Sequence, residues 1–146
     1  MKKIKSLLIA SFFLLLGMNA FGQNKINAND LTQEWTLLDT QDGIKIYIKH
    51  GECQMGNIKE AFEYGMLKIV NTTNTEKMVI YNIENYYTDG CVGCDTNEDE
   101  YTAIIIPANT TKIGNCENGH SVLIKNPLQT AFTDFQYLQL TIFNVK

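Results

Sequence analysis

Residues 44–49 have the sequence IKIYIK, in which isoleucine alternates strictly with lysine or tyrosine. Side chains of a β-strand point alternately to opposite faces, so this pattern places the isoleucines on one face and the polar groups on the other. Asp42 and Gly43 before the stretch, and Gly51 after it, are typical turn residues. The stretch therefore predicts a strand with one buried face.

Further apolar stretches on both sides of this strand have the composition of strands. They are residues 65–70 (GMLKIV), 78–83 (MVIYNI), 101–106 (YTAIII), 111–114, 122–124 (VLI) and 135–145 (FQYLQLTIFNV). The polar segment 71–75 predicts a hairpin between the first two, and residues 58–62 (IKEAF) allow only a helix of one or two turns. About seven strands at regular spacing predict an all-β fold, an antiparallel, immunoglobulin-like β-sandwich, with a small barrel as the alternative.

The N-terminus has the order of features that defines a secretory signal peptide. Three lysines among the first five residues precede the apolar stretch 7–16 (LLIASFFLLL), and Ala20 and Gly22 then offer small residues to a signal peptidase. The apolar stretch is short against the ~20 residues that span a bilayer, which favours cleavage over a permanent anchor. The expected organisation is a cleavable signal peptide, a flexible lead and one sandwich domain, at residues 1–22, 23–34 and 35–146.

The charge balance narrows the classes of partner. All 12 basic residues are lysines, and the chain has 16 acids. Once residues 1–22 are removed, 9 lysines and 16 acids remain, which gives a formal charge of −7. Such a surface repels phosphate backbones, and the chain lacks the arginine fork that nucleic-acid recognition uses most. We therefore expect no nucleic-acid partner and no membrane span after signal cleavage.

Four cysteines, Cys53, Cys91, Cys94 and Cys116, carry the most specific prediction. An even number in an exported domain favours two disulfide bonds, which would join the ends of separate strands. If consecutive strands alternate in direction, all four sulfurs lie at one end of the sandwich. The alternatives are a structural Cys₄ zinc site, for which only one close pair is present, and a redox-active C-x-x-C, which normally lies at a helix N-terminus.

Residues 95–100 (DTNEDE) are the densest acidic stretch. Asp95, Asn97 and Asp99 have the spacing that opens an EF-hand calcium loop. The match then ends, because Glu100 stands where that loop needs glycine and Ile106 where it needs glutamate. The loop from Cys91 to Glu100 is thus a metal-binding alternative, for calcium or for structural zinc.

Other candidate sites are few. His120 precedes Ser121, the only serine after residue 22, but neighbouring strand residues point to opposite faces and cannot act as a pair. His50 and His120 are expected on the surface or at strand ends rather than as metal ligands. Trp35 and the tyrosine pair 86–87 could form a sugar-stacking platform, although a core position is the commoner role for the tryptophan and only one tyrosine can face outward.

The stretch from Trp35 through residues 43–46 (GIKI), the cysteines and Glu100-Tyr101 resembles small, uncharacterised exported proteins of Gram-negative bacteria. The resemblance implies an exported sandwich and no catalytic residue. Together the observations predict an exported, disulfide-stapled, non-enzymatic β-sandwich, a binding or envelope-associated module of the periplasm, the cell surface or the medium. We expect a protein or glycan partner and no cofactor.

Overall fold

The computed structural model of the chain describes residues 24–94, 101–117, 119–128 and 134–146. Within these ranges it contains ten β-strands and one 3-10 turn, η1 (Ala28–Asp30), and no α-helix. The strands are β1 (Lys25–Asn27), β2 (Thr36–Gln41), β3 (Ile44–Cys53), β4 (Phe62–Asn71), β5 (Lys77–Tyr87), β6 (Gly90–Val92), β7 (Thr102–Ile106), β8 (Thr111–Ile113), β9 (Ser121–Lys125) and β10 (Phe135–Val145).

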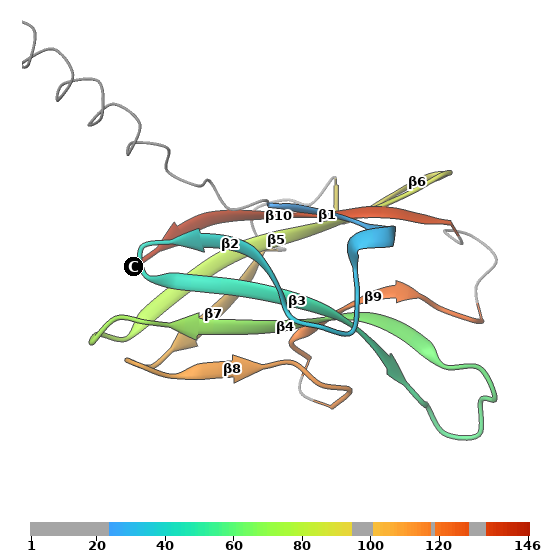
Figure 1. The fold of residues 1–146 in the computed structure, drawn as a ribbon, viewed down its shortest axis with the longest axis horizontal. Helices are drawn as coiled ribbons and strands as arrows, with labels where there is room; N and C mark the ends of the chain where they lie inside the picture. Colours follow the sequence, from blue (N-terminus) through green and yellow to red (C-terminus); the bar gives the residue numbers. More distant parts are fainter. Residues whose placement is uncertain (1–23, 95–100, 118, 129–133) are drawn as a thin grey trace, which may run out of the picture.

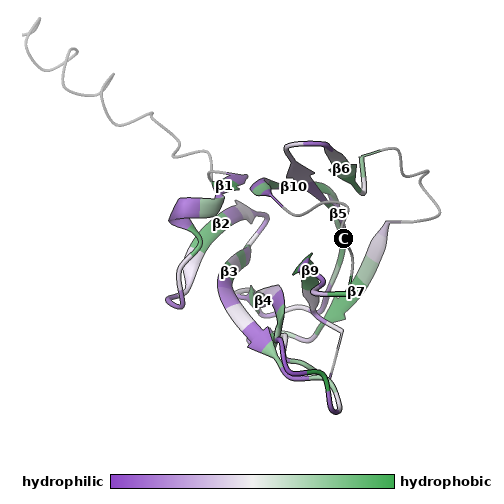
Figure 2. Cartoon of the chain, turned by 90° about the vertical axis from the view of Figure 1, so that its right-hand side faces the viewer, coloured by the Kyte–Doolittle hydropathy of each residue, from purple (hydrophilic) through white to green (hydrophobic). Residues whose placement is uncertain are grey.

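The strands form two antiparallel sheets that face each other (Figures 1 and 2). In the first sheet, β1, β10 and β5 lie in that order, and β6 and β7 both pair with the remaining edge of β5. In the second sheet, β2, β3 and β4 lie in order, and β8 and β9 both pair with the remaining edge of β4. The predicted all-β antiparallel sandwich is confirmed, with three strands more than the seven expected, namely β1, β2 and β6. Of these, β1 and β6 are only three residues long, which is too short to give a sequence pattern. That the sandwich is immunoglobulin-like in detail stays a prediction.

The core between the sheets follows from the alternation of the strands. Ile44, Ile46 and Ile48 of β3 are fully buried, as residues 44–49 predict. From the other sheet, Leu138 and Leu140 of β10 are buried to the same degree. Burying a large aliphatic side chain contributes roughly 1.5–3 kcal/mol relative to leaving it in water, so this double layer is the main source of stability.

β3 and β4 form a long hairpin in which ten residues of each strand are paired. The sequence indicates a turn at Gly51, but β3 continues through this residue to Cys53. Glycine suits the position because a Cβ there would lie 2.8 Å from Met66 Cγ. The hairpin also takes Phe62 into β4, opposite Cys53. Residues 58–62 therefore do not form the short helix that their sequence allows.

The expected hairpin between residues 65–70 and 78–83 is wrong, because these residues belong to β4 and β5 in different sheets. Asn71, only 1% exposed, stabilises this change of sheet. Its Nδ2 donates to the carbonyl oxygens of Thr75 at 2.8 Å and Ile106 at 3.0 Å, and its Oδ1 accepts from the Thr73 backbone N–H at 2.9 Å. These bonds satisfy the backbone of the turn and connect it to the end of β7, so the chain crosses to the opposite layer.

The N-terminal lead is more ordered than its polar composition indicates. Within the expected flexible lead, 23–34, β1 pairs with β10, and Ile26, opposite Leu138, is 4% exposed. One apolar side chain among polar neighbours is thus enough to anchor this short strand in the core. The expected signal peptide, residues 1–22, lies outside the described residues, among which no helix is long and apolar enough to cross a membrane.

Candidate functional site

The first disulfide joins Cys53, the last residue of β3, to Cys116 in the connection between β8 and β9. The two Cα atoms are 5.7 Å apart, and the cysteines are separated by 63 positions in the sequence. Cys53 is 1% exposed, whereas Cys116 lies on the surface. This bond closes a long loop of chain within the second sheet.

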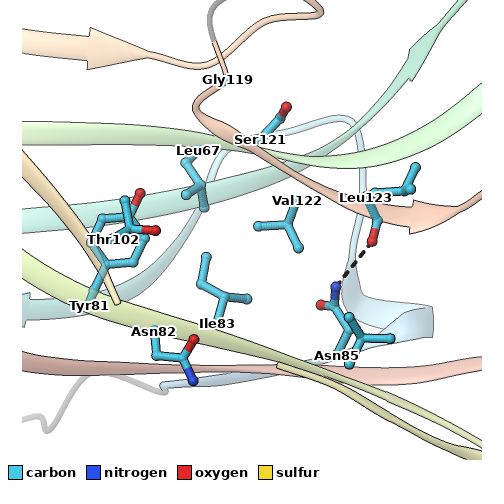
Figure 3. Close-up of a pocket in the computed structure, with 11 residues that line it drawn as sticks. Leu67, Tyr81, Asn82, Ile83, Asn85, Thr102, Gly119, Ser121, Val122 and Leu123 are labelled. Atoms are coloured by element: carbon cyan, nitrogen blue, oxygen red, sulfur yellow. Dashed lines mark hydrogen bonds between the residues drawn. The ribbon is translucent and has the colours of Figure 1, made fainter. Parts of the chain in front are cut away.

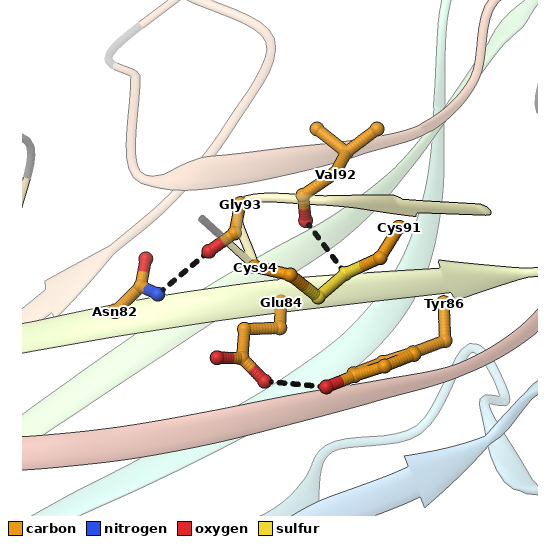
Figure 4. Close-up of a disulfide and its surroundings, with 7 residues drawn as sticks. All are labelled: Asn82, Glu84, Tyr86, Cys91, Val92, Gly93 and Cys94. Carbon is orange, nitrogen blue, oxygen red and sulfur yellow. Dashed lines mark hydrogen bonds between the residues drawn. A yellow bond between two sulfur atoms is a disulfide. The ribbon is translucent and has the colours of Figure 1, made fainter. Parts of the chain in front are cut away.

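The second disulfide joins Cys91 of β6 to Cys94, three residues later (Figure 4). Gly93 between them has φ +85°, and a Cβ there would lie 2.6 Å from the Ile83 carbonyl oxygen, so only glycine fits this turn. Asn82 Nδ2 donates to the Gly93 carbonyl oxygen at 2.9 Å. The small ring therefore lies fixed against β5.

Disulfide bonds are present as the cysteine count predicts, and their pairing rules out the Cys₄ zinc alternative. The expectation that both bonds join the ends of separate strands is wrong for Cys91–Cys94, which closes a single turn after β6. A disulfide sulfur cannot act as a thiolate ligand. Among the described residues, no group of three or more His, Cys, Asp or Glu side chains is placed to hold a metal ion. The C-x-x-C pair lies in a strand and turn and not at a helix N-terminus, where thiol oxidoreductases place theirs. The calcium candidates Asp95, Asn97 and Asp99 lie outside the described residues, so that alternative stays a prediction.

Both disulfides lie toward one end of the sandwich, on different sheets. Cys91 pairs with Tyr86 near the end of β5, and Cys53 pairs with Phe62 at the start of β4. The Tyr87 hydroxyl, at the end of β5, donates to the Ile124 carbonyl oxygen of β9. Because β9 pairs with the first half of β4, this bond connects the two strand ends. This is the placement that alternating strand directions predict.

A pocket of about 320 Å³ lies between the two sheets (Figure 3). β4, β5, β6, β7, β9 and the residues just before β9 contribute its lining. The lining residues are Leu67, Tyr81, Asn82, Ile83, Asn85, Val92, Thr102, Gly119, Ser121, Val122 and Leu123.

The pocket exists because each sheet carries two short strands along one edge. The β6 pairing with β5 ends at Asn85 and the β7 pairing ends at Tyr81, so residues 82–84 have no ladder partner on this edge among the described residues. In the opposite sheet, β8 and β9 separate at Leu67, whose backbone N–H donates to the His120 carbonyl oxygen at 3.0 Å. The pocket lies beside this break in the described strand pairing of the first sheet.

Asn85 is the most unusual residue of the pocket. Its side chain is 2% exposed, and Nδ2 donates to the Leu123 carbonyl oxygen across the sheets at 3.1 Å. Within the described part of the chain, its Oδ1 has no hydrogen-bond partner. The amide cannot be reversed, because Oδ1 would then face the Leu123 carbonyl oxygen. Figure 3 shows the amide at one end of the pocket, with Oδ1 on the side of Ile83.

A buried acceptor without a partner costs about 1–3 kcal/mol, and such groups are rare in folded proteins. The remaining polar lining groups are hydroxyls and one further amide, from Tyr81, Thr102, Ser121 and Asn82. Burial raises the pKa of Tyr81 to about 12, so its hydroxyl is neutral at physiological pH. The described lining is therefore uncharged, with Leu67, Ile83 and Val122 forming the apolar wall.

A second hollow of about 260 Å³ contains His50, Glu63 and Lys125. His50 Nε2 lies 3.3 Å from Glu63 Oε2, and Lys125 Nζ lies 3.4 Å from Glu63 Oε1. The glutamate thus uses one oxygen in a hydrogen bond with His50 and the other in an ion pair with Lys125. We interpret this cluster as closing the sandwich rather than as a ligand site, which agrees with a strand position for His50.

The aromatic residues divide between the two faces. The expected core position of Trp35 is wrong: it is partly exposed, and Lys49 Nζ and Lys68 Nζ lie 5.0 Å and 4.8 Å from its ring centroid. The ring is therefore already engaged by two ammonium groups, which would compete with a sugar for it. Of the tyrosine pair, Tyr87 is buried, and Tyr86 stacks on Tyr137 with the ring centroids 4.3 Å apart.

Sequence reasoning missed Asn85 and the pocket. The sequence does contain an indication of the buried asparagine. Alternation places residues 79, 81, 83, 85 and 87 of β5 on one face. An asparagine on an otherwise valine, tyrosine and isoleucine face is a buried polar group that needs a partner. Ser121, which has no catalytic partner in the sequence, contributes a hydroxyl to the pocket.

In comparisons with known proteins, the chain matches no protein-family model and no curated sequence. Among solved structures it is similar to the Salmonella enterica trimeric lipoprotein SadB, with a TM-score of 0.39 and 11% identity. The similarity covers 97% of this chain and 71% of that one. A likeness this distant carries no functional argument, and membership of a family of exported proteins stays a prediction.

Proposed function

We propose that the protein is an exported, non-enzymatic binding module, stapled by two disulfides, whose ligand occupies the pocket between the sheets. Disulfides are typical of proteins that fold outside the cytoplasm, and residues 1–22 have the composition of a signal peptide. Binding suits a rigid scaffold, because a stapled sandwich loses little conformational entropy when a ligand enters.

The observation that carries this proposal is the partnerless Oδ1 of Asn85, in a pocket of the size that small ligands use. A buried polar group without a partner costs stability, and a hydrogen bond from a ligand would offset that cost. The adjacent Leu67, Ile83 and Val122 supply apolar surface for the rest of the ligand.

The lining favours binding over catalysis. A general acid or base works best when its pKa lies near the operating pH. Tyr81, with a pKa of about 12, is the titratable group of the described lining, and the hydroxyls of Thr102 and Ser121 have no adjacent base within that lining. These groups can hold and orient a molecule, but they cannot readily move a proton at neutral pH.

Export is tested by producing the full chain in a Gram-negative host. We expect the product outside the cytoplasm to begin at Gln23 and to contain no free thiol. An uncleaved product that stays in the cytoplasm with four free thiols would contradict this part of the proposal.

Binding is tested by NMR on the ¹⁵N- and methyl-labelled chain 23–146, with acetamide, 2-butanol and N-acetylglucosamine as separate probes. We expect at least one probe to shift the Leu67, Ile83 and Val122 signals with saturation. Val122→Phe, which fills the pocket, should abolish the shifts, and Phe143→Leu on the exposed outer face should preserve them. If neither these probes nor a branched amide such as isobutyramide shifts the pocket signals, the pocket is not a binding site.

A further inference from the structure

We infer that the ligand is a small, uncharged molecule with a hydrogen-bond donor, of the carboxamide class, whose N–H binds Asn85 Oδ1 while its aliphatic part lies against Leu67, Ile83 and Val122. This inference rests on the proposed function, since it names the ligand class for the same pocket. It is carried by three properties of the site: the open acceptor, the uncharged lining and the apolar wall.

The requirement for a donor follows from the orientation of the Asn85 amide. Because Nδ2 is held by the Leu123 carbonyl oxygen at 3.1 Å, the group left unpaired among the described residues is the buried acceptor Oδ1. A ligand oxygen at this point would face another oxygen, whereas an N–H would complete the pair. Where a buried group is built to receive a hydrogen bond, analogues without the donor are rejected strongly, because that group stays unpaired.

The described lining residues favour an uncharged ligand. Among the described residues of the pocket there is no Asp, Glu, Lys or His side chain. A buried charge is costly without a countercharge, so a carboxylate or an ammonium group would lose hydration that this lining does not replace. A carboxamide offers a strong N–H donor with no net charge.

The position of the apolar residues defines the rest of the ligand. In Figure 3, Ile83 and Val122 lie between Asn85 at one end of the pocket and Tyr81 with Thr102 at the other. Leu67 lies above the same central space. A short branched aliphatic group attached to the amide would therefore fill the centre, within a pocket of about 320 Å³.

Three probes with similar carbon skeletons test the inference: isobutyramide, 3-methyl-2-butanone and isobutyrate. They keep the branched aliphatic group and carry, respectively, an N–H donor, no donor and a negative charge. Protein-observed NMR titrations of the chain 23–146 give the affinity of each. We expect isobutyramide to bind about tenfold more tightly than the ketone, the ratio that one buried hydrogen bond supplies, and isobutyrate to bind more weakly than both.

Asn85→Leu should abolish the preference for the amide over the ketone. Asn144→Leu, the same change on β10 outside the pocket lining, should leave the preference intact. The wild-type ratio and the shift of the Asn85 side-chain N–H signals test the inference even if Asn85→Leu does not fold. Equal binding of amide and ketone, or a preference that survives in a folded Asn85→Leu variant, would overturn the inferred class and leave the pocket as a binding site. If none of the probes in either experiment binds, the proposed function fails as well.

Discussion

Removal of each disulfide by a double substitution to alanine is expected to have very different effects. Cys53→Ala with Cys116→Ala opens a loop of 63 residues, and Cys91→Ala with Cys94→Ala opens a loop of three. A disulfide stabilises mainly by restricting the unfolded chain, and the restriction grows with loop length. The long-range bond should therefore dominate the free energy of unfolding.

The loop-entropy relation gives about 4 kcal/mol for the first bond and about 1.6 kcal/mol for the second. For a domain of this length, these values correspond to a fall in Tm of about 15 °C and about 6 °C. Cys53 is also 1% exposed, so its truncation removes packed atoms and adds to the first loss. Cys91 and Cys94 are only partly buried, so their truncation removes fewer packed atoms.

Urea unfolding of the wild type and both double variants, followed by tryptophan fluorescence and circular dichroism, gives the two differences directly. The reduced wild type provides a control, since it should lose about the sum of both effects. If the variant lacking Cys91 and Cys94 were destabilised as much as the variant lacking Cys53 and Cys116, the loop-length reasoning would be refuted.

Three further perturbations test other parts of the structure. Burial raises the pKa of Tyr81 from 10.0 to about 12, so the folded state holds the hydroxyl proton more tightly than the unfolded state. The free energy of unfolding is therefore unaffected by this group below pH 10 and falls by about 3 kcal/mol as the pH rises to 12. Urea unfolding between pH 9 and pH 12 should show a smaller decline for Tyr81→Phe, and an equal decline would contradict the assignment. Asn71→Ala leaves the Thr75 and Ile106 carbonyl oxygens without this donor and should lower the free energy of chemical unfolding by about 3 kcal/mol. A loss below about 1 kcal/mol would show that the crossover does not depend on this side chain. Gly93→Ala forces a Cβ against a backbone carbonyl at positive φ, and we expect faster amide hydrogen exchange in β6 with unchanged exchange in β3; unchanged exchange in both strands would refute it.

The sequence was informative where a pattern is local. Strict alternation located the buried face of β3, and the bounds of β10 agree with the apolar stretch 135–145. Alternation reports which face of a strand is buried, but it contains no information on which strand lies beside it. Residues 65–70 and 78–83 were therefore placed in one hairpin, while the Asn71 hydrogen bonds direct the chain to the other sheet.

The pocket could be predicted only in part. An asparagine on the inward face of β5 marks a buried polar group, and this much is visible in the sequence. The sequence does not show that Leu123 binds Asn85 Nδ2 and leaves Oδ1 unpaired. This arrangement depends on a contact between residues 38 positions apart. The gap that opens the pocket likewise arises from the way β6 and β7 share one edge of β5, which no local pattern specifies.

A crystal structure of the mature protein soaked with isobutyramide tests the central claim most directly. We predict the amide in the pocket between the sheets, with its nitrogen at about 2.7–3.2 Å from Asn85 Oδ1 and its methyl groups against Ile83 and Val122. A pocket that contains only an ordered water bound to Asn85, with isobutyramide elsewhere or absent, would contradict the account.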